Sequence, residues 1–134
     1  MHVLITANSP GELAGWVWPV AEAIKRRDPS GRVTLVITPC QYASGAESQV
    51  ARNCPWLDHI VPRQAFLKAL LRGRSYLAPD PSEDTRVLFL GGDVFYAVVL
   101  ARRLGAPLLA HLTTPRWVRQ VTTAFVPDET ARQK

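Results

Sequence analysis

Residues 2–19, HVLITANSPGELAGWVWP, join an apolar run to a segment with the composition of a helix start. Residues 2–7 are typical of a buried strand, and residues 19–27 carry apolar side chains at helical spacing with a basic end. We expect Ser9–Pro19 to form a loop that leaves the strand and opens the helix. A strand followed at once by a helix is the first part of a βαβ unit.

The rest of the chain repeats this alternation. Strand-like runs rich in apolar or β-branched residues occupy 32–38, 58–61, 86–90, 107–112 and 121–126. Helical patterns occupy 43–53, 63–73 and 94–104, and a helical turn is expected at 116–120. The sequence therefore predicts a doubly wound, mainly parallel, Rossmann-like α/β sheet with helices on both faces. We expect residues 1–127 to form this single domain and residues 128–134 to be a polar tail or the start of a linker.

Ligands of such sheets bind outside the carboxyl ends of the strands. The predicted connections that lie at that edge are residues 8–18, 39–42, 91–93 and 113–117. Residues in these connections are therefore the first candidates for a functional site.

The chain has 134 residues, a net charge of +5 and two cysteines, Cys40 and Cys54. The cysteines do not form a CxxC pair, and no His, Cys or Asp cluster has metal-ligand spacing, so we expect no metal site. No basic leader or apolar stretch of about 20 residues is present, which favours a cytoplasmic protein. The positive charge suggests a phosphorylated ligand or an anionic membrane surface. No nucleic-acid-binding motif accompanies the charge, so we do not expect the chain to bind nucleic acid.

Gly11 and Gly15 precede the predicted helix, where free backbone N–H groups favour an anion. The spacing matches neither GxGxxG nor GxxxxGK[ST]. Ser9 and Glu12 also fit the S-x-x-E capping box, in which Glu12 only caps its own helix. Of the two nearby tryptophans, Trp16 and Trp18, at least one is expected to line a binding surface, although burial of both is an alternative.

Gly91, Gly92 and Asp93 follow the most apolar strand and place a carboxylate at the ligand-binding edge. Asp93 is suited to act as a general base toward a substrate hydroxyl. Its alternative role is the N-cap of the helix over 94–104, which the sequence alone favours. His111, inside a strand-like run, is expected to be a buried or hydrogen-bonded core histidine and not a catalyst.

The predicted helix at 63–74 combines apolar and basic side chains as interfacial helices do. The residues expected to contact a membrane are Phe66, Leu67, Lys68, Leu70, Arg72 and Arg74. The alternative is a surface helix that packs its apolar face on the sheet and leaves its charges in water.

Three groups of motifs resemble GT-B glycosyltransferases. GELAGW at 11–16 resembles a loop near the N-terminus of lipid-A-disaccharide synthase, and GWVWP at 15–19 resembles a turn of the N-acetylglucosaminyltransferase that makes lipid II. The segments 89–93, 101–105 and 113–117 are similar in order and spacing to later βα units of the synthase. Trp16 replaces an Asp or His of these families, so the acceptor is not fixed and lipid A is not implied.

The resemblance implies the acceptor-binding, N-terminal half of an inverting enzyme that moves a sugar from a nucleotide-sugar, UDP-linked in these families, to a lipid-linked acceptor. Asp93 would be the general base, and Glu12, which matches the family glutamate, would be a second catalytic residue. The implied substrate-binding residues are Ser9, Gly11, Gly15, Trp16, Gly91, Gly92, Thr113 and Thr114. The donor would bind a second domain or subunit, with no cofactor in this chain, and the enzyme would sit peripherally on the inner membrane. The alternative is a non-catalytic nucleotide- or phosphate-binding module that regulates or recruits a partner.

Overall fold

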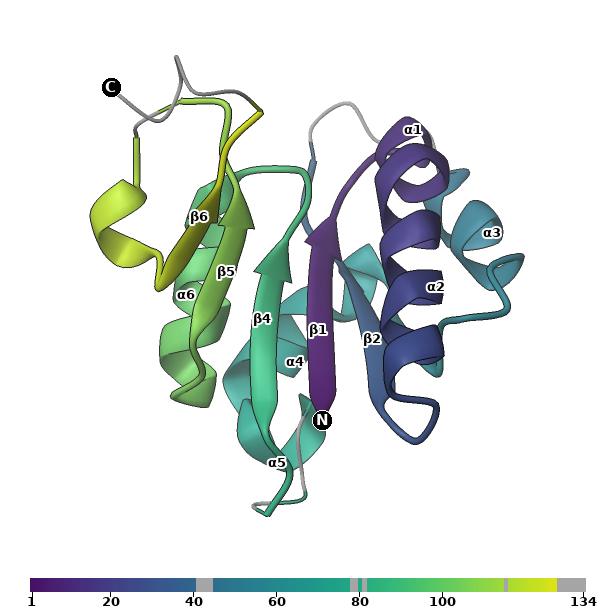
Figure 1. The fold of residues 1–134 in the computed structure, drawn as a ribbon, viewed down its shortest axis with the longest axis horizontal. Coiled ribbons are helices and arrows are strands. Elements are labelled where there is room, and N and C mark those ends of the chain that lie inside the picture. Colours follow the sequence, from purple (N-terminus) through teal and green to yellow (C-terminus); the bar gives the residue numbers. More distant parts are fainter. Residues whose placement is uncertain (41–44, 78–79, 81, 115, 128–134) are drawn as a thin grey trace.

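The computed structural model describes residues 1–40, 45–77, 80, 82–114 and 116–127. These residues contain a six-stranded parallel sheet in the order β3-β2-β1-β4-β5-β6 (Figure 1). Its strands are β1 (His2–Ala7), β2 (Arg32–Ile37), β3 (His59–Val61), β4 (Thr85–Phe89), β5 (Leu108–His111) and β6 (Thr123–Phe125). The predicted doubly wound, parallel α/β fold is confirmed.

Helices cover both faces of the sheet. They are α1 (Pro10–Glu12), α2 (Trp18–Arg27), α3 (Glu47–Arg52), α4 (Phe66–Arg72), α5 (Arg74–Leu77) and α6 (Val94–Leu104). Figure 1 shows α2 in front of β2, α3 at the edge beyond α2, and α4 and α6 behind the sheet. The α3 helix shares the core of α2, and α5 shares the core of α4 and α6. The chain moves across the sheet in one direction from β1 through β2 to β3, and then in the opposite direction from β4 through β5 to β6. Because crossover connections are right-handed, the helices of these two halves lie on opposite faces of the sheet.

The central strand β1 is buried on both faces and divides the core in two. Leu4 packs with α4, α5 and α6, whereas Ile5 packs with α2 and α3. This alternation follows from the two-residue period of a strand. Neighbouring strands keep a regular register, with His2 opposite Arg32 in β2 and Thr85 in β4.

The first helix differs from the prediction, because it begins at Pro10 and not at Pro19. After α1, the π-helical turn η1 (Leu13–Val17) leads directly into α2. The Trp18 N–H donates to the Leu13 carbonyl, five residues back. A proline inside a regular helix removes a hydrogen bond and collides with the carbonyl four residues before it. The wider turn ends just before Pro19 and accommodates that residue.

The predicted helix at 63–73 is divided into a 3₁₀ turn, η2 (Arg63–Ala65), and α4. Gly73, with φ of 56°, then turns the chain into α5, where a loop was predicted. The predicted turn at 116–120 is the 3₁₀ segment η3 (Val118–Gln120). Residues 43 and 44 of the predicted helix at 43–53, and the tail at 128–134, lie outside the described residues.

The helix at 94–104 matches its prediction at both ends. Asp93 is its N-cap, and Gly105 follows in the left-handed conformation with φ of 61°. In the described part of the chain, no helix is long and apolar enough to cross a membrane.

Candidate functional site

The Glu12 carboxylate holds together the ends of two strands. Its Oε2 accepts hydrogen bonds from the backbone N–H groups of Asn8 (3.0 Å) and Ser9 (3.3 Å). Its Oε1 accepts one from the backbone N–H of Gly92 (3.3 Å), 80 residues further along the chain. The Ser9 hydroxyl in turn accepts from the Glu12 N–H, so the predicted capping box is present. Glu12 therefore links the turn after β1 to the turn after β4.

This arrangement changes the interpretation of the helix start as an anion site. The N–H groups of Asn8 and Ser9 already bind the carboxylate of Glu12, so they are not available to an external phosphate. The chain thus supplies its own anion at this position.

Gly91 and Gly92 are required by the residues packed against them. A Cβ atom at Gly91 would overlap the Glu12 carboxylate, lying 2.6 Å from Oε1. Gly92 has φ of 85°, and a Cβ atom there would lie 2.8 Å from the Thr38 hydroxyl. In contrast, Cβ atoms at Gly11 and Gly15 would meet nothing within 4 Å. Packing within the described residues therefore explains why Gly91 and Gly92 are glycines, and it does not explain Gly11 and Gly15.

Asp93 is exposed and caps α6, as the sequence favoured. One carboxylate oxygen accepts a hydrogen bond of 2.9 Å from the Phe95 N–H. The other oxygen accepts none from the described residues. A carboxylate held by one oxygen in this way keeps its orientation and retains a lone pair for a ligand.

Asp93 lies at a polar cavity of about 430 Å³ beyond the carboxyl ends of β4 and β5. This volume lies within the range of small-molecule sites. The polar lining comes from Asp93, His111, Thr113, Thr114 and Arg116. The apolar part of the lining is completed by Phe89, Val94, Leu112 and Trp117, with Gly92. The structure thus brings together four of the predicted site residues: Gly92, Asp93, Thr113 and Thr114.

Trp117 forms one wall of this cavity in an unusual backbone conformation. Its φ of 73° lies in the left-handed region, which bulky side chains rarely adopt. The Arg116 guanidinium lies 5.6 Å from the centre of the indole ring, and the Phe95 ring lies 6.2 Å away. Such conformations cost about 1–3 kcal/mol and cluster at functional sites. No local sequence pattern predicts this conformation.

His111 is the site residue that the sequence analysis misplaced. It is half-buried and lines the polar cavity, so it is not a core histidine. Its ring meets Trp16 edge to face, with centroids 5.0 Å apart. Its place as the last residue of β5 was the available signal, because that residue reaches the ligand-binding edge.

Other predicted site residues lie apart from the polar cavity. Gly15 and Trp16 line a separate, apolar groove, which His111 also borders. Trp16 is 44% exposed, whereas Trp18 is half-buried and its indole N–H has no partner among the described residues. Ser9, Gly11 and Gly91 line neither cavity. In the described residues, no group of three or more His, Cys, Asp or Glu side chains is arranged to hold a metal ion.

The predicted membrane-contact set needs correction. Phe66 is 4% exposed and packs edge to face on Tyr96, with centroids 5.3 Å apart, so its side chain does not reach lipid. Leu70 is half-buried against the core, and the Arg74 guanidinium donates to the Leu104 carbonyl. The outward face consists of Leu67, Lys68, Leu71 and Arg72; the two leucines are 64% and 67% exposed.

Comparison with protein-family models finds no match, and comparison with curated protein sequences finds none either. Among solved structures, this chain is similar to a glycosyl transferase family 9 protein from Veillonella parvula DSM 2008. The two share 17% sequence identity with a TM-score of 0.65, over 95% of this chain and 36% of that protein. The likeness supports a fold like that of a GT-B glycosyltransferase domain. This chain thus spans little more than a third of that protein's length.

Proposed function

We propose that this chain is the acceptor-binding part of a glycosyltransferase that moves a sugar from a nucleotide-sugar to a lipid-linked acceptor. The observation that carries the proposal is Asp93, an exposed carboxylate at the rim of a polar cavity beyond two parallel strands. The resemblance of its fold to a glycosyl transferase family 9 protein supports the same reaction class.

Asp93 is the catalytic residue of this proposal. Its carboxylate accepts the proton of the acceptor hydroxyl as the hydroxyl oxygen bonds to the sugar and the nucleotide diphosphate leaves. The hydrogen bond from the Phe95 N–H fixes the orientation of the carboxylate before the acceptor binds. Thr113 and Thr114, both exposed and lining the same cavity, supply hydroxyls that hydrogen-bond the acceptor.

Glu12 is better suited to a positioning role than to the catalytic role that the resemblance implies. Its carboxylate is held by three backbone N–H groups and does not line the polar cavity. Through Gly92 it fixes the turn that carries Asp93. Loss of Glu12 would therefore weaken transfer by displacing Asp93.

Ligand binding to this chain, followed by amide NMR, tests the proposal against a nucleotide-binding module. We expect sugar headgroups from a panel of glycolipids to shift the signals of Asp93, Thr113 and Thr114, and UDP to shift none of them. The donor is proposed to bind a second domain or subunit. Tight binding of UDP by this chain would favour the nucleotide-binding module. Absence of binding by every sugar would refute an acceptor site.

We also propose that α4 rests on an anionic membrane surface through Leu67, Lys68, Leu71 and Arg72. Two exposed leucines one helical turn apart, flanked by two cations, form the apolar and electrostatic parts of an interfacial contact. The expected location is therefore peripheral, at the cytoplasmic side of the inner membrane.

Sedimentation with vesicles tests this contact. We expect binding to vesicles containing phosphatidylglycerol, reduced by salt and by L67E/L71E, and little binding to pure phosphatidylcholine. R102E, which removes an exposed cation from α6, is the matched control and should leave binding unchanged. Equal binding of L67E/L71E and the unaltered chain would exclude this surface.

A further inference from the structure

Among the described residues, one face of the sheet is only half covered. In Figure 1, α2 stands in front of β2 and beside β1, while no helix of the described chain lies in front of β4, β5 and β6. The helices packed on β4 and β5 lie on the other face. Leu88 and Leu109, on the uncovered face, are both only half-buried.

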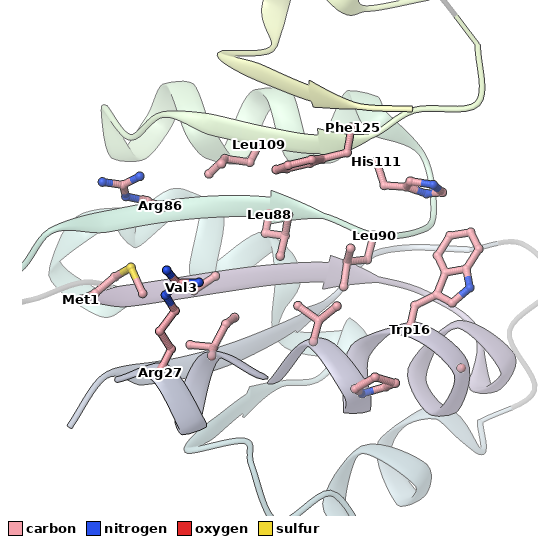
Figure 2. A pocket seen from close by; sticks show the side chains of 14 residues that line it. Met1, Val3, Trp16, Arg27, Arg86, Leu88, Leu90, Leu109, His111 and Phe125 are labelled. Carbon is pink, nitrogen blue, oxygen red and sulfur yellow. The ribbon is translucent and has the colours of Figure 1, made fainter. Parts of the chain in front are cut away.

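The uncovered face forms an apolar groove of about 1000 Å³ (Figure 2). Its floor is built from Leu88 and Leu90, Leu109 and His111, and Phe125, which come from β4, β5 and β6 and their ends. Phe125 remains 49% exposed. An apolar surface of this extent on a sheet face normally packs against another layer of structure.

One wall of the groove is a helix edge with the spacing of a packing ridge. Trp16, Val20 and Ile24 follow one another at intervals of four residues along η1 and α2, and all three line the groove. Rows of side chains at this spacing are the ridges that fit between the side chains of a neighbouring helix, at interaxial distances of 8–10 Å. The space beside α2 and above β4 and β5 therefore suits another helix.

The charges at the groove indicate what that helix carries. Arg27 lies at the end of α2, beside Met1 and Val3 in Figure 2, and forms no ion pair with any described residue. Arg86 also lines this end and pairs with Asp84. The groove lining contains no acidic residue among those described. A second copy of the same face would bring only further positive charge, so the charges favour a different, acidic partner.

We propose that this groove binds an amphipathic helix of the polypeptide that carries the donor-binding domain. The helix places an apolar stripe on Leu88, Leu109 and Trp16 and an acidic side chain beside Arg27. The inference rests on the proposed function, because that function requires a donor-binding part. It is compatible with the match to the glycosyl transferase family 9 protein, most of which lies outside the matched 36%.

Photo-crosslinking in the intact protein, expressed in its own host, tests this docking. Leu109 is replaced by p-benzoylphenylalanine, and the same replacement at Leu71, exposed on α4, is the control. We expect the probe at position 109 to crosslink to a helical peptide from the polypeptide with the donor-binding domain, and the probe at 71 not to. R27E should reduce the crosslinking yield at 109 several-fold, whereas R102E should leave it unchanged.

Other outcomes overturn the inference. A crosslink to residues 1–134 of another chain, identified by mixing isotope-labelled with unlabelled protein, would mean that a second copy occupies the groove, and a lipid adduct would make it a lipid site. Adducts within the same chain alone, or no adduct at all, would show an uncovered face. The crosslink reports docking whether or not the protein is active, and sugar transfer is measured separately by the reaction itself. A failure of docking is therefore distinguishable from a failure of the proposed function.

Discussion

Replacement of Gly91 by alanine should destabilise the protein, and prior removal of the Glu12 side chain should reverse the sign of that effect. The added Cβ would overlap the Glu12 carboxylate. That carboxylate is the far end of a flexible side chain, so its movement alone costs little. The cost comes from the hydrogen bonds to Asn8, Ser9 and Gly92 that break as it moves.

The size of the effect follows from those bonds. Hydrogen bonds to a charged group contribute about 1.5–3 kcal/mol each, but Glu12 is half-buried, and two of its bonds are 3.3 Å long. We therefore expect G91A to cost about 2–3 kcal/mol in total, and E12A a similar amount. For a chain of this length the loss corresponds to a fall in Tm of about 8–12 °C.

The two substitutions together should not add. Gly91 does not have a positive φ, and the three atoms nearest to an added Cβ all belong to the Glu12 carboxylate, so removing that side chain removes the closest contacts. Alanine at a compatible glycine position stabilises by about 0.4–1 kcal/mol through the unfolded chain. In the E12A background, G91A should therefore be stabilising.

Urea unfolding of the four variants in a double-mutant cycle measures this coupling. G92A is the control, because φ of 85° and the contact with the Thr38 hydroxyl make it destabilising with or without Glu12. An equal cost of G91A in both backgrounds would refute the placement of the carboxylate.

Two further predictions concern buried groups. Burial lowers the pKa of His2 below its ordinary 6.5, so the folded state binds fewer protons than the unfolded state; the free energy of unfolding should fall as the pH drops below about 6.5. Urea unfolding at pH 5.5 and 7.5 should show this loss of free energy. The H2Q variant should lose less free energy between the two pH values, whereas a control substitution at exposed His59 should leave the loss unchanged. An unchanged pH dependence in H2Q would refute the assignment of the loss to His2. Burial also raises the pKa of the Cys54 thiol, so a thiol reagent should label C40S only after denaturation; rapid labelling of folded C40S would contradict the burial of Cys54.

The fold was predictable because its signals are local. Residues 32–37 and 94–104 form elements close to those predicted, since β-branched composition and the Asp93 and Gly105 caps act within a few residues. The helix start was predicted too late. The residue pattern predicts Pro19 as the first helical residue, but the capping box at Ser9 starts the helix earlier, and a π turn accommodates the proline.

The candidate site was predictable only in part, since its contacts join distant segments. The capping role of Glu12 depends on Ser9, three residues away, and was recognised as an alternative. Its bond to Gly92 depends on two turns meeting across the sheet, which no local pattern encodes. The burial of Phe66 could not be decided from the sequence for a related reason, because an amphipathic pattern does not state whether its apolar face packs on the sheet or contacts lipid.

Sugar transfer by D93N tests whether the Asp93 carboxylate acts as the base in acceptor activation. Asparagine caps a helix as well as aspartate does, so D93N should keep the Tm of the unaltered protein. D93A removes the cap and should lower the free energy of unfolding by about 1 kcal/mol. In the enzyme assembled with its donor-binding part, transfer from UDP-sugars to glycolipid acceptors should fall by about 10²–10⁴-fold in D93N. D84N, which alters another exposed carboxylate, should transfer normally. Undiminished transfer by a stably folded D93N would contradict this role of Asp93.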